Sequence, residues 1–592
     1  MDGGRAHLDR AGARVSLQAL AGLIGLNALY LAAGAAFLWL VRGATDWIDV
    51  ARFAGLAYVV GVVLTGSLWT LILIAGVPFS LGVVLAVPIA LTGAFVAAGQ
   101  RRGRKIPRGG RLPGGTPLIV TAVGIAAAGV LLQGLFRMAR LSGLYWFDGW
   151  SFWVPKAKAI YFFGELDEQF FTELPGASYP LLVPALDAAA FHVMGGPDVI
   201  TLHTQFWLLG VGFVWAFAGS LSERVPPWIL WPFVLLVLLA PRVGRRFQIA
   251  EADLWLDYLF VLAAMLVGVW LLEHERWRLV VATVLLSGAV LTKREGLLLA
   301  TVLIAAALVT TARQRRARWP AIALSAFAVA VVAAPWRIWY IAHDIEGEAG
   351  SEGLIQQDDL GGVWPAVRRA LEVFWEPSYW NVIVPLFVGA LVVATLARVG
   401  TLLAFFGTLT AFVLAGGIWA TWVFSQTGTG FVLGGNFIIR YMGAAALLCV
   451  AATPLLLASA WPRERVEVES PRARRRVGLA AAIVVVPLLV YPAVTMAGGA
   501  ARFPTREECV QPAVEGEPVD VVYGRFDSPV EAAELLERVL TVGFTGTETL
   551  FDACGRWKVV LEGVPSLEIA RGVQEEAATV DLEPTLERGV DG

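Results

Sequence analysis

The sequence predicts a polytopic membrane protein made of α-helices, followed by a small α+β domain at its C-terminus. The first observation is composition: 57% of the 592 residues are hydrophobic and only 16% are charged, whereas soluble domains carry about 25% charged residues. The second is the length of the apolar segments, many of which reach the roughly 20 residues needed to cross a bilayer. The third is a sharp rise in acidic residues after residue 500.

Hydropathy predicts about 13 to 14 transmembrane helices. Three strongly basic segments, 101–111, 312–318 and 463–476, are predicted to be cytoplasmic because positively charged loops stay inside. Segment 179–196 is short and has Asp187 in its middle, so we expect it to be interfacial or re-entrant. The orientation of the first three helices stays open. The approximate spans are 15–41, 52–76, 78–98, 117–137, 199–221, 227–240, 255–272, 279–292, 296–311, 320–341, 380–398, 401–424, 438–459 and 477–499.

The chain therefore divides into four parts. Residues 1–115 hold extra N-terminal helices and a basic loop, and residues 116–460 hold a helical module with a large external loop over 138–198. Residues 461–499 contain a basic cytoplasmic loop and the last helix. Residues 500–592 are predicted to be an extracytoplasmic domain.

The segment YWFDGWSFWVPKAK, residues 145–158, carries the strongest functional signal. It places Asp148, Lys156 and Lys158 among aromatic residues at the edge of a membrane, where a charged side chain is costly. The aromatic residues suit the membrane interface. A reaction on a lipid-linked anionic substrate would explain why the acid and the lysines are there.

Further charged residues fall on the same predicted side of the membrane. They occur in PRVGRRFQIAEAD (241–253), LTKREG (291–296) and NFIIRY (436–441). An ordinary solvated loop, a plain hairpin turn and a snorkelling arginine are the simpler interpretations of these three segments. The alternative is that they converge with Asp148 on one external cavity.

Such a cavity would suit transfer of a sugar from a polyprenyl phosphate. The departing lipid phosphate needs lysine or arginine nearby, and the acceptor hydroxyl needs a carboxylate that accepts its proton. Asp148 is the predicted base, and Mg²⁺ or Mn²⁺ held by Asp148, Glu251 and Asp253 is a further expectation. The predicted donor-phosphate residues are Lys156, Lys158, Arg440, Arg245, Lys293 and Arg294, and those that position acceptor or metal are Glu251, Asp253, Glu295, Tyr179 and Tyr441.

Residues 117–460 resemble the GT-C superfamily of membrane glycosyltransferases, which includes protein mannosyltransferases and aminoarabinose transferases. The motifs that carry the resemblance are WFDGW around Asp148, SYPLLVP (178–184), EADL (251–254), LTKREG (291–296) and the Arg440–Tyr441 pair. The resemblance implies a GT-C-like fold in which Asp148 acts as base or metal-site acid. The chain departs from the family in its three extra N-terminal helices, and Glu251 and Asp253 only approximate an Asp-x-Asp motif.

The C-terminal segment alternates between strand and helix patterns. Strands are expected over 519–526 and 555–563, helices over 528–544 and 566–578, and weaker strands near 546–551 and 579–583, which together suggest a ferredoxin-like sandwich. The segment resembles SPOR domains through Gly524, Phe526, Trp557 and related positions, which implies binding to peptidoglycan; a generic small α+β domain is the alternative. Cys509 and Cys554 are either a disulfide, which an external compartment permits, or a free pair.

The leading hypothesis is an inverting glycosyltransferase of a bacterial plasma membrane that acts on an extracytoplasmic cell-envelope glycan or polysaccharide. Its expected partners are the lipid bilayer, the polyprenyl-phosphate-linked donor and the glycan acceptor, with no nucleic acid. The alternative is a transporter or flippase of a lipid-linked glycan, which predicts charges spread through mid-membrane positions.

Overall fold

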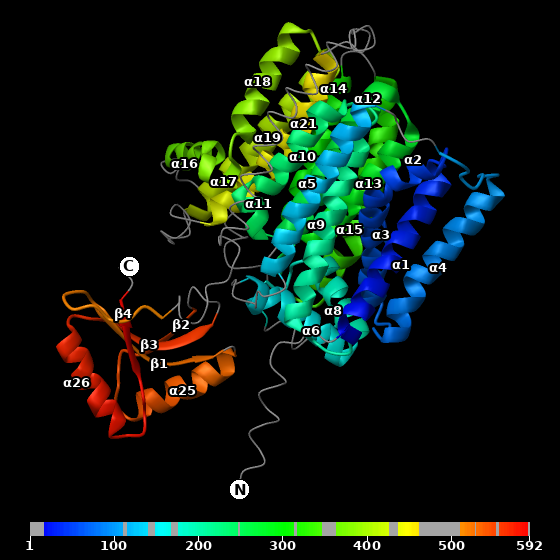
Figure 1. Cartoon of the computed structure of the whole chain (residues 1–592). Coiled ribbons are helices and arrows are strands. Elements are labelled where there is room, and N and C mark those ends of the chain that lie inside the picture. The colour runs from blue at the N-terminus through cyan, green and yellow to red at the C-terminus, as the bar shows by residue number, and fades with distance from the viewer. Residues whose placement is uncertain are drawn as a thin grey trace. The chain divides into compact units, whose positions relative to one another are not determined.

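The computed structural model separates into two compact units, residues Met1–Val490 and Tyr491–Gly592 (Figure 1). Each unit is considered by itself. The structure describes residues 17–110, 115–139, 148–166, 174, 176–246, 249–312, 316–345, 363–425, 436–460, 510–526, 528–551 and 556–589. The predicted span 477–499, the basic segment 463–476, Cys509 and Cys554 lie outside these residues.

The first unit is helical, and nine helices in its described part are long and apolar enough to cross a membrane. They match nine predicted spans. The spans predicted over 227–240, 279–292, 296–311 and 380–398 form helices of 13, 17, 17 and 14 residues, fewer than the roughly 20 that a full crossing takes. The nine are α1 (Leu17–Val41), α3 (Ala54–Ile74), α4 (Leu81–Arg101), α5 (Thr116–Ala139), α9 (Val199–Leu221), α12 (Ala252–Glu273), α15 (Trp319–Ala342), α19 (Gly400–Ser425) and α21 (Asn436–Ala460).

The remaining helices are shorter and connect or cover these nine. They are α2 (Trp47–Arg52), the π-helix η2 (Gly149–Trp153), α6 (Val154–Phe163), α8 (Leu182–Met194), α10 (Pro227–Leu239), α11 (Pro241–Arg246), α13 (Arg276–Thr292), α14 (Glu295–Thr311), α16 (Val363–Trp375), α17 (Pro377–Trp380) and α18 (Ile383–Leu396).

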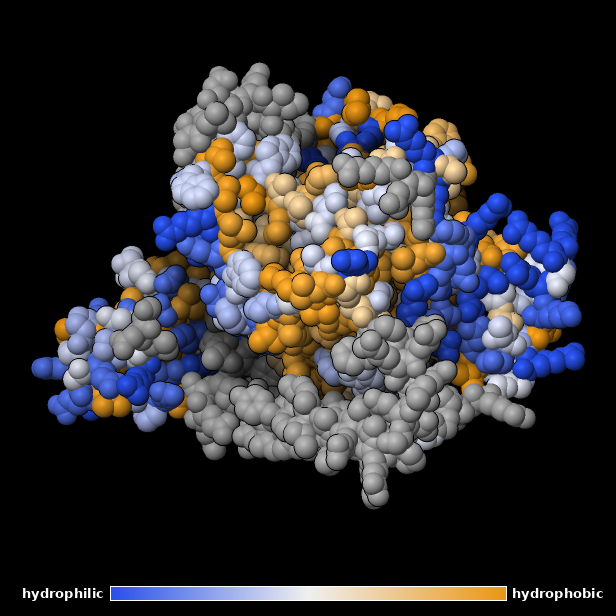
Figure 2. All heavy atoms as spheres, turned by 90° about the horizontal axis from the view of Figure 1, so that it is seen from above, coloured by the Kyte–Doolittle hydropathy of each residue, from blue (hydrophilic) through white to orange (hydrophobic). Residues whose placement is uncertain are grey.

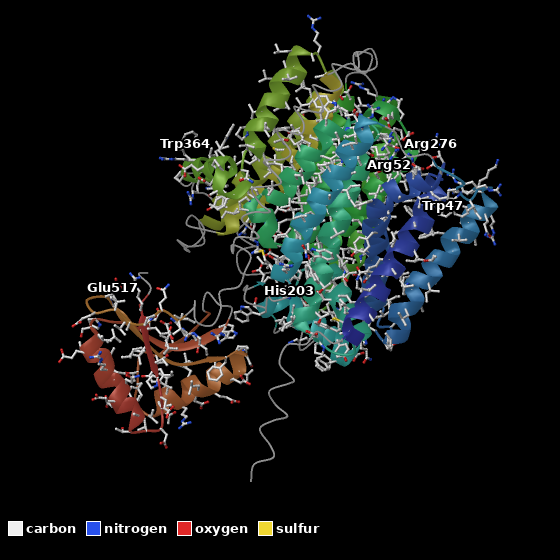
Figure 3. The ribbon with its side chains drawn as sticks, in the orientation of Figure 1. Trp47, Arg52, His203, Arg276, Trp364 and Glu517 are labelled. Atoms are coloured by element: carbon white, nitrogen blue, oxygen red, sulfur yellow. The ribbon has the colours of Figure 1, made fainter. Side chains whose placement is uncertain are left out.

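Two groups of residues mark the opposite ends of the helical unit. Trp47, Arg52 and Arg276 lie at one end, and His203, near the start of α9, lies at the other (Figure 3). Seen from above, hydrophilic side chains gather near α2 and the loop after α4 (Figure 2). That loop belongs to the first basic segment, and its exposed residues include Arg101, Arg102 and Lys105.

Helix α12 forms the centre of the helical unit. Its most apolar stretch is completely buried, as expected for a helix that is hydrophobic all round. It packs against α13, α21, α19 and α9. Two carboxylates in its first two turns, Asp253 and Asp257, are consequently buried as well, and buried charges of this kind need partners.

Segment 179–196, expected to be interfacial or re-entrant, contains the 13-residue helix α8, which is buried along nearly its whole length. A Cβ atom added at Gly66 of α3 would lie 2.5 Å from Leu182, and one added at Gly22 of α1 would lie 2.0 Å from the Val193 carbonyl oxygen. Because Gly66 lies in the second half of α3 and Gly22 near the start of α1, α8 runs from inside the helices back toward one end. This path favours the re-entrant alternative.

The second unit has the order β1 (Val519–Phe526), α25 (Pro529–Thr541), β2 (Glu548–Phe551), β3 (Trp557–Val564), α26 (Leu567–Ala578) and β4 (Thr585–Arg588). The strands form an antiparallel sheet in the order β2-β3-β1-β4, which is the expected ferredoxin-like arrangement. Ser528 and Ser566 cap the two helices, and their side chains accept hydrogen bonds from the backbone N–H groups of Val530 and Ile569. The prediction of a strand at 579–583 was wrong, because Asp581 adopts a left-handed conformation (φ 57°) and turns the chain before β4.

Candidate functional site

Three segments far apart in the sequence bring Asp148, Asp253 and Arg440 together. Asp148 directly precedes η2, Asp253 lies in the first turn of α12, and Arg440 lies in the second turn of α21. The Arg440 guanidinium donates to Asp148 Oδ2 and to Asp253 Oδ2, the latter at 2.7 Å. The predicted convergence of these charges is therefore present, and all three side chains are at most 8% exposed.

Lys293 extends this ion pair to a fourth segment, the connection between α13 and α14. Its Nζ atom lies 3.0 Å from Asp253 Oδ1 and 3.1 Å from Glu295 Oε1. Burial alone would lower the pKa of Lys293, but Asp253 and Glu295 together raise it above its ordinary value. Lys293 therefore carries its charge inside the protein, where a lysine without acidic partners would lose it.

Glu251, the residue before α12, differs from its neighbours because it is fully buried and neither carboxylate oxygen accepts a hydrogen bond. The Nε atom of Arg246 lies 3.7 Å from Glu251 Oε1, too far for one. Burial, together with the nearby charge of Asp253, raises the pKa of Glu251. Orphaned carboxylate oxygens of this kind require an explanation.

A divalent cation offers that explanation. Asp148, Glu251 and Asp253 each present an oxygen atom, and the three atoms lie within 4.8 Å of one another. Carboxylate oxygens are the ligands that Mg²⁺ and Mn²⁺ prefer. The acid set predicted from sequence is thus assembled, and its geometry and orphaned oxygens fit a metal ion.

Sequence reasoning placed Arg246 on the same side as the acids, in a candidate phosphate clamp, but did not select Asp257, with which Arg246 forms a buried ion pair next to this cluster. Arg246 ends α11, and Asp257 lies one helical turn after Asp253 on α12. The i, i+4 spacing of two aspartates in an otherwise apolar helix was the available signal, because it places both on one face. The pair holds α11 against the start of α12 and supports the position of Glu251.

Tyr179 gathers a second group of cations. The distance from its ring centroid is 5.9 Å to Lys156 Nζ, 5.8 Å to Lys293 Nζ and 5.2 Å to Arg294 Cζ. These distances lie within the range of cation–π contacts. Lys156 is fully buried, and its ammonium group donates to the carbonyl oxygen of Gly176. Since Lys293 contacts both groups, the cations around Tyr179 adjoin the acidic cluster.

Not every predicted site residue joins these groups. Lys158 is half-buried on α6, and in the described residues it forms no ion pair with the acids. Two residues along a helix correspond to a rotation of about 200° from Lys156. Arg245 lies in α11, but its side chain is outside the described part. Tyr441 follows Arg440 and lines a neighbouring cavity.

That cavity has a volume of about 60 Å³, enough for a few water molecules. Asp253, Glu295, Arg440 and Tyr441 line its polar part. Apolar side chains of α14, α19 and α21 line the rest, among them Val302, Phe412 and Ala444. The charged cluster therefore borders a narrow apolar gap between helices.

Together these features describe a buried acidic cluster with an adjoining cationic group, at the end of the helical unit where α12, α14 and α21 begin. It offers a carboxylate near a cation-binding position, and positive side chains that can hold an anion. The comparisons with known proteins add no relative: no protein-family model, curated protein or solved structure matches the chain.

Proposed function

We propose that the protein is an inverting glycosyltransferase that moves a sugar from a polyprenyl-phosphate donor to a hydroxyl of a cell-envelope glycan. The observation that carries the proposal is the assembly of Asp148, Glu251 and Asp253 within 4.8 Å, bridged by Arg440, in a chain with nine helices able to cross a membrane among its described residues. A GT-C-like membrane fold in a bacterial plasma membrane, with the site outside, belongs to the same proposal.

Asp148 is the proposed general base. Its carboxylate accepts a hydrogen bond from Arg440, and it would accept the proton of the acceptor hydroxyl as that oxygen attacks the sugar. The donor phosphate leaves as an anion and needs no proton from the protein. One base therefore suffices, unlike the paired acids of soluble glycoside hydrolases.

Glu251 and Asp253, with Asp148, would hold a divalent cation, which when bound supplies positive charge for the departing phosphate. The remaining positive charge comes from the chain itself. Arg440 is engaged by two acids, so the cations around Tyr179 suit the donor phosphate better, with Arg294 the half-buried member. The apolar lining of the cavity on α14, α19 and α21 suits the first part of the donor lipid.

The test uses purified full-length protein, candidate polyprenyl-phosphate sugars and an envelope glycan extract, with release of polyprenyl phosphate as the readout. Asp148→Asn should lower acceptor-dependent release at least about 100-fold, because general bases contribute roughly 10²- to 10⁴-fold. Asp49→Asn is the matched control: Asp49 is also buried and paired with an arginine, Arg42, but lies in α2 at the opposite end.

Equal release by the wild type and Asp148→Asn would remove Asp148 from the mechanism. No release with any donor, together with movement of the lipid-linked glycan across vesicle membranes, would favour the flippase alternative. Transfer that survives Asp148→Asn but fails with Asp49→Asn would show that stability rather than chemistry governs the assay.

A further inference from the structure

A second group of buried polar side chains lies among α1, α3 and α8, separate from the acidic cluster. Asp187 of α8 is fully buried, and neither of its carboxylate oxygens has a hydrogen-bond partner. The hydroxyls of Tyr30 and Thr65 and the indole N–H of Trp69 are also fully buried without partners. Four orphaned polar groups in one region point to a missing ligand or to enclosed water.

Contacts between the helices bring these groups together. The rings of Tyr30 and Trp69 are 5.9 Å apart, Thr65 lies one helical turn before Trp69 on the same face of α3, and Tyr30 is within electrostatic range of Asp187. Close packing fixes the arrangement: a Cβ atom added at Gly61 would lie 1.8 Å from the Tyr30 carbonyl oxygen. Glycine at this position lets α1 and α3 approach closely.

The charge of Asp187 must be neutralised. A carboxylate buried without a partner costs far more than a folded domain can supply, so it either takes up a proton or binds a cation. In the described part of the chain no basic side chain pairs with it. A single carboxylate is neutralised by a single positive charge, and a divalent ion would leave one charge uncompensated. Carboxylate and hydroxyl oxygens are hard ligands that suit Na⁺ rather than a soft metal.

We propose that Asp187, with the hydroxyl groups of Tyr30 and Thr65, forms a second buried site that takes up one monovalent positive charge, a proton or Na⁺. The site goes beyond the proposed sugar transfer and does not depend on it. An intramembrane carboxylate is by default a candidate functional group, and this one gives the N-terminal helices a role. Because α8 begins shortly after Tyr179, the loaded site would fix α1 and α3 against the segment that carries Tyr179.

The other titratable groups on elements that pack against α8 are engaged elsewhere or lie farther along it. Lys156 of α6 donates to Gly176, and His203 of α9 contacts the carbonyl oxygen of Val199. His192, on α8 itself, packs against the rings of Phe79 and Tyr161. Tyr58 of α3 donates to Asn27, and Arg278 of α13 binds three glutamates. Tyr30 is thus the titratable neighbour that the test must consider.

The first experiment is labelling with dicyclohexylcarbodiimide, an apolar reagent that reacts with protonated carboxyl groups. Full-length protein in detergent is labelled across pH 6 to about 9 in sodium chloride or choline chloride of equal ionic strength, and the modified residue is located by mass spectrometry. We expect Asp187 to be labelled. Labelling that Na⁺ slows identifies a sodium site, and labelling that only rising pH slows identifies a proton site.

Two variants complete the test through thermal unfolding in the same solutions. Asp187→Asn removes the charge and should abolish any dependence of the melting temperature on Na⁺ that the wild type shows. Thr65→Val keeps the shape and the charge but removes one oxygen ligand. For a sodium site, it should raise at least tenfold the Na⁺ concentration that half-protects Asp187 from labelling. For a proton site, it should leave labelling unchanged. Absence of labelling at every pH, with a wild-type melting temperature indifferent to Na⁺, would overturn the proposal.

Discussion

Replacing Asp253 with asparagine should destabilise the helical unit more than any single change at its surface. The Asp253 carboxylate lies 2.7 Å from Arg440 Nη2 and 3.0 Å from Lys293 Nζ. Hydrogen bonds to charged groups contribute about 1.5–3 kcal/mol each, and breaking a buried ion pair costs about 3–5 kcal/mol. In the variant, Arg440 would still have Asp148 as an ion-pair partner, and Lys293 would still have Glu295. We therefore expect a loss near the lower limit, about 3 kcal/mol in the free energy of unfolding.

The measurement is equilibrium unfolding of the full chain in mixed micelles, with sodium dodecyl sulfate as denaturant and tryptophan fluorescence as the signal. Glu372→Gln is the control, since Glu372 forms ion pairs with Arg368 and Arg369 on the exposed side of α16 and its loss should not be measurable. The reasoning is refuted if Asp253→Asn loses less than about 1 kcal/mol, because an intact buried network would not tolerate that change so easily.

Four further predictions concern the metal, pH, the donor and the C-terminal unit. Wild-type protein should bind one Mn²⁺ ion per chain by electron paramagnetic resonance, and Glu251→Gln should weaken that binding at least tenfold. Burial raises the folded-state pKa of Glu251 above its unfolded value. The contribution of Glu251 to stability is therefore present below the unfolded pKa and is lost as pH rises through the folded pKa. In the presence of a chelator, Glu251→Gln should flatten the fall in melting temperature above about pH 4.5. Arg294→Gln should raise the donor KM about tenfold, worth roughly 1.4 kcal/mol, while Lys158→Gln leaves it unchanged in the same assay. Residues 510–592 expressed alone should melt cooperatively, with a circular dichroism spectrum of mixed helix and strand.

The end of the unit at which the site forms could be predicted from the sequence. That prediction needs only the basic loops and the number of helices between each loop and each site residue. A basic loop fixes one end of a helix, and each subsequent helix reverses the direction, so Asp148, Glu251, Lys293 and Arg440 were expected on the same side, and their convergence was one of the alternatives. The sequence does not contain the helix rotations that decide which of them touch. Arg440, expected at the donor phosphate, instead bridges two acids.

Side-chain partners inside the helical unit were predicted least well. Lys156 and Lys158 were both candidates for the donor phosphate, but a separation of two residues places them on different sides of α6. Arg246 was expected, as one alternative, to bind phosphate with its neighbours in 241–253, but its partner Asp257 was not selected. Its partner becomes visible only when α11 and α12 are packed. Segment 179–196 was expected to be interfacial or re-entrant, since a short apolar segment with a central aspartate cannot cross a bilayer cheaply, and the short buried helix α8 agrees with that expectation.

A comparison between the two ends of the helical unit gives the strongest reason to regard the acidic cluster as functional. The opposite end also has a network of buried charges, centred on Arg42 and Arg278. There every acid in the network is bound: Asp49 and Glu223 by Arg42, and Glu223, Glu273 and Glu275 by Arg278. The acids of this network therefore need no ligand, and the buried atom left without a hydrogen-bond partner among these residues is the donor Nη1 of Arg278.

The site end uses the same residue types but leaves its network open. Glu251 is more deeply buried than any acid of the opposite end, yet it accepts no hydrogen bond. The Nε atom of Arg246 lies 3.7 Å from Glu251 Oε1, but Arg246 donates to Asp257, and Arg440 donates to Asp148 and Asp253. A protein that needed only stability would gain by replacing Glu251 with an apolar residue. Its presence beside two further carboxylates is therefore best explained by a positive charge that arrives with a ligand, which is what the Mn²⁺ titration measures directly.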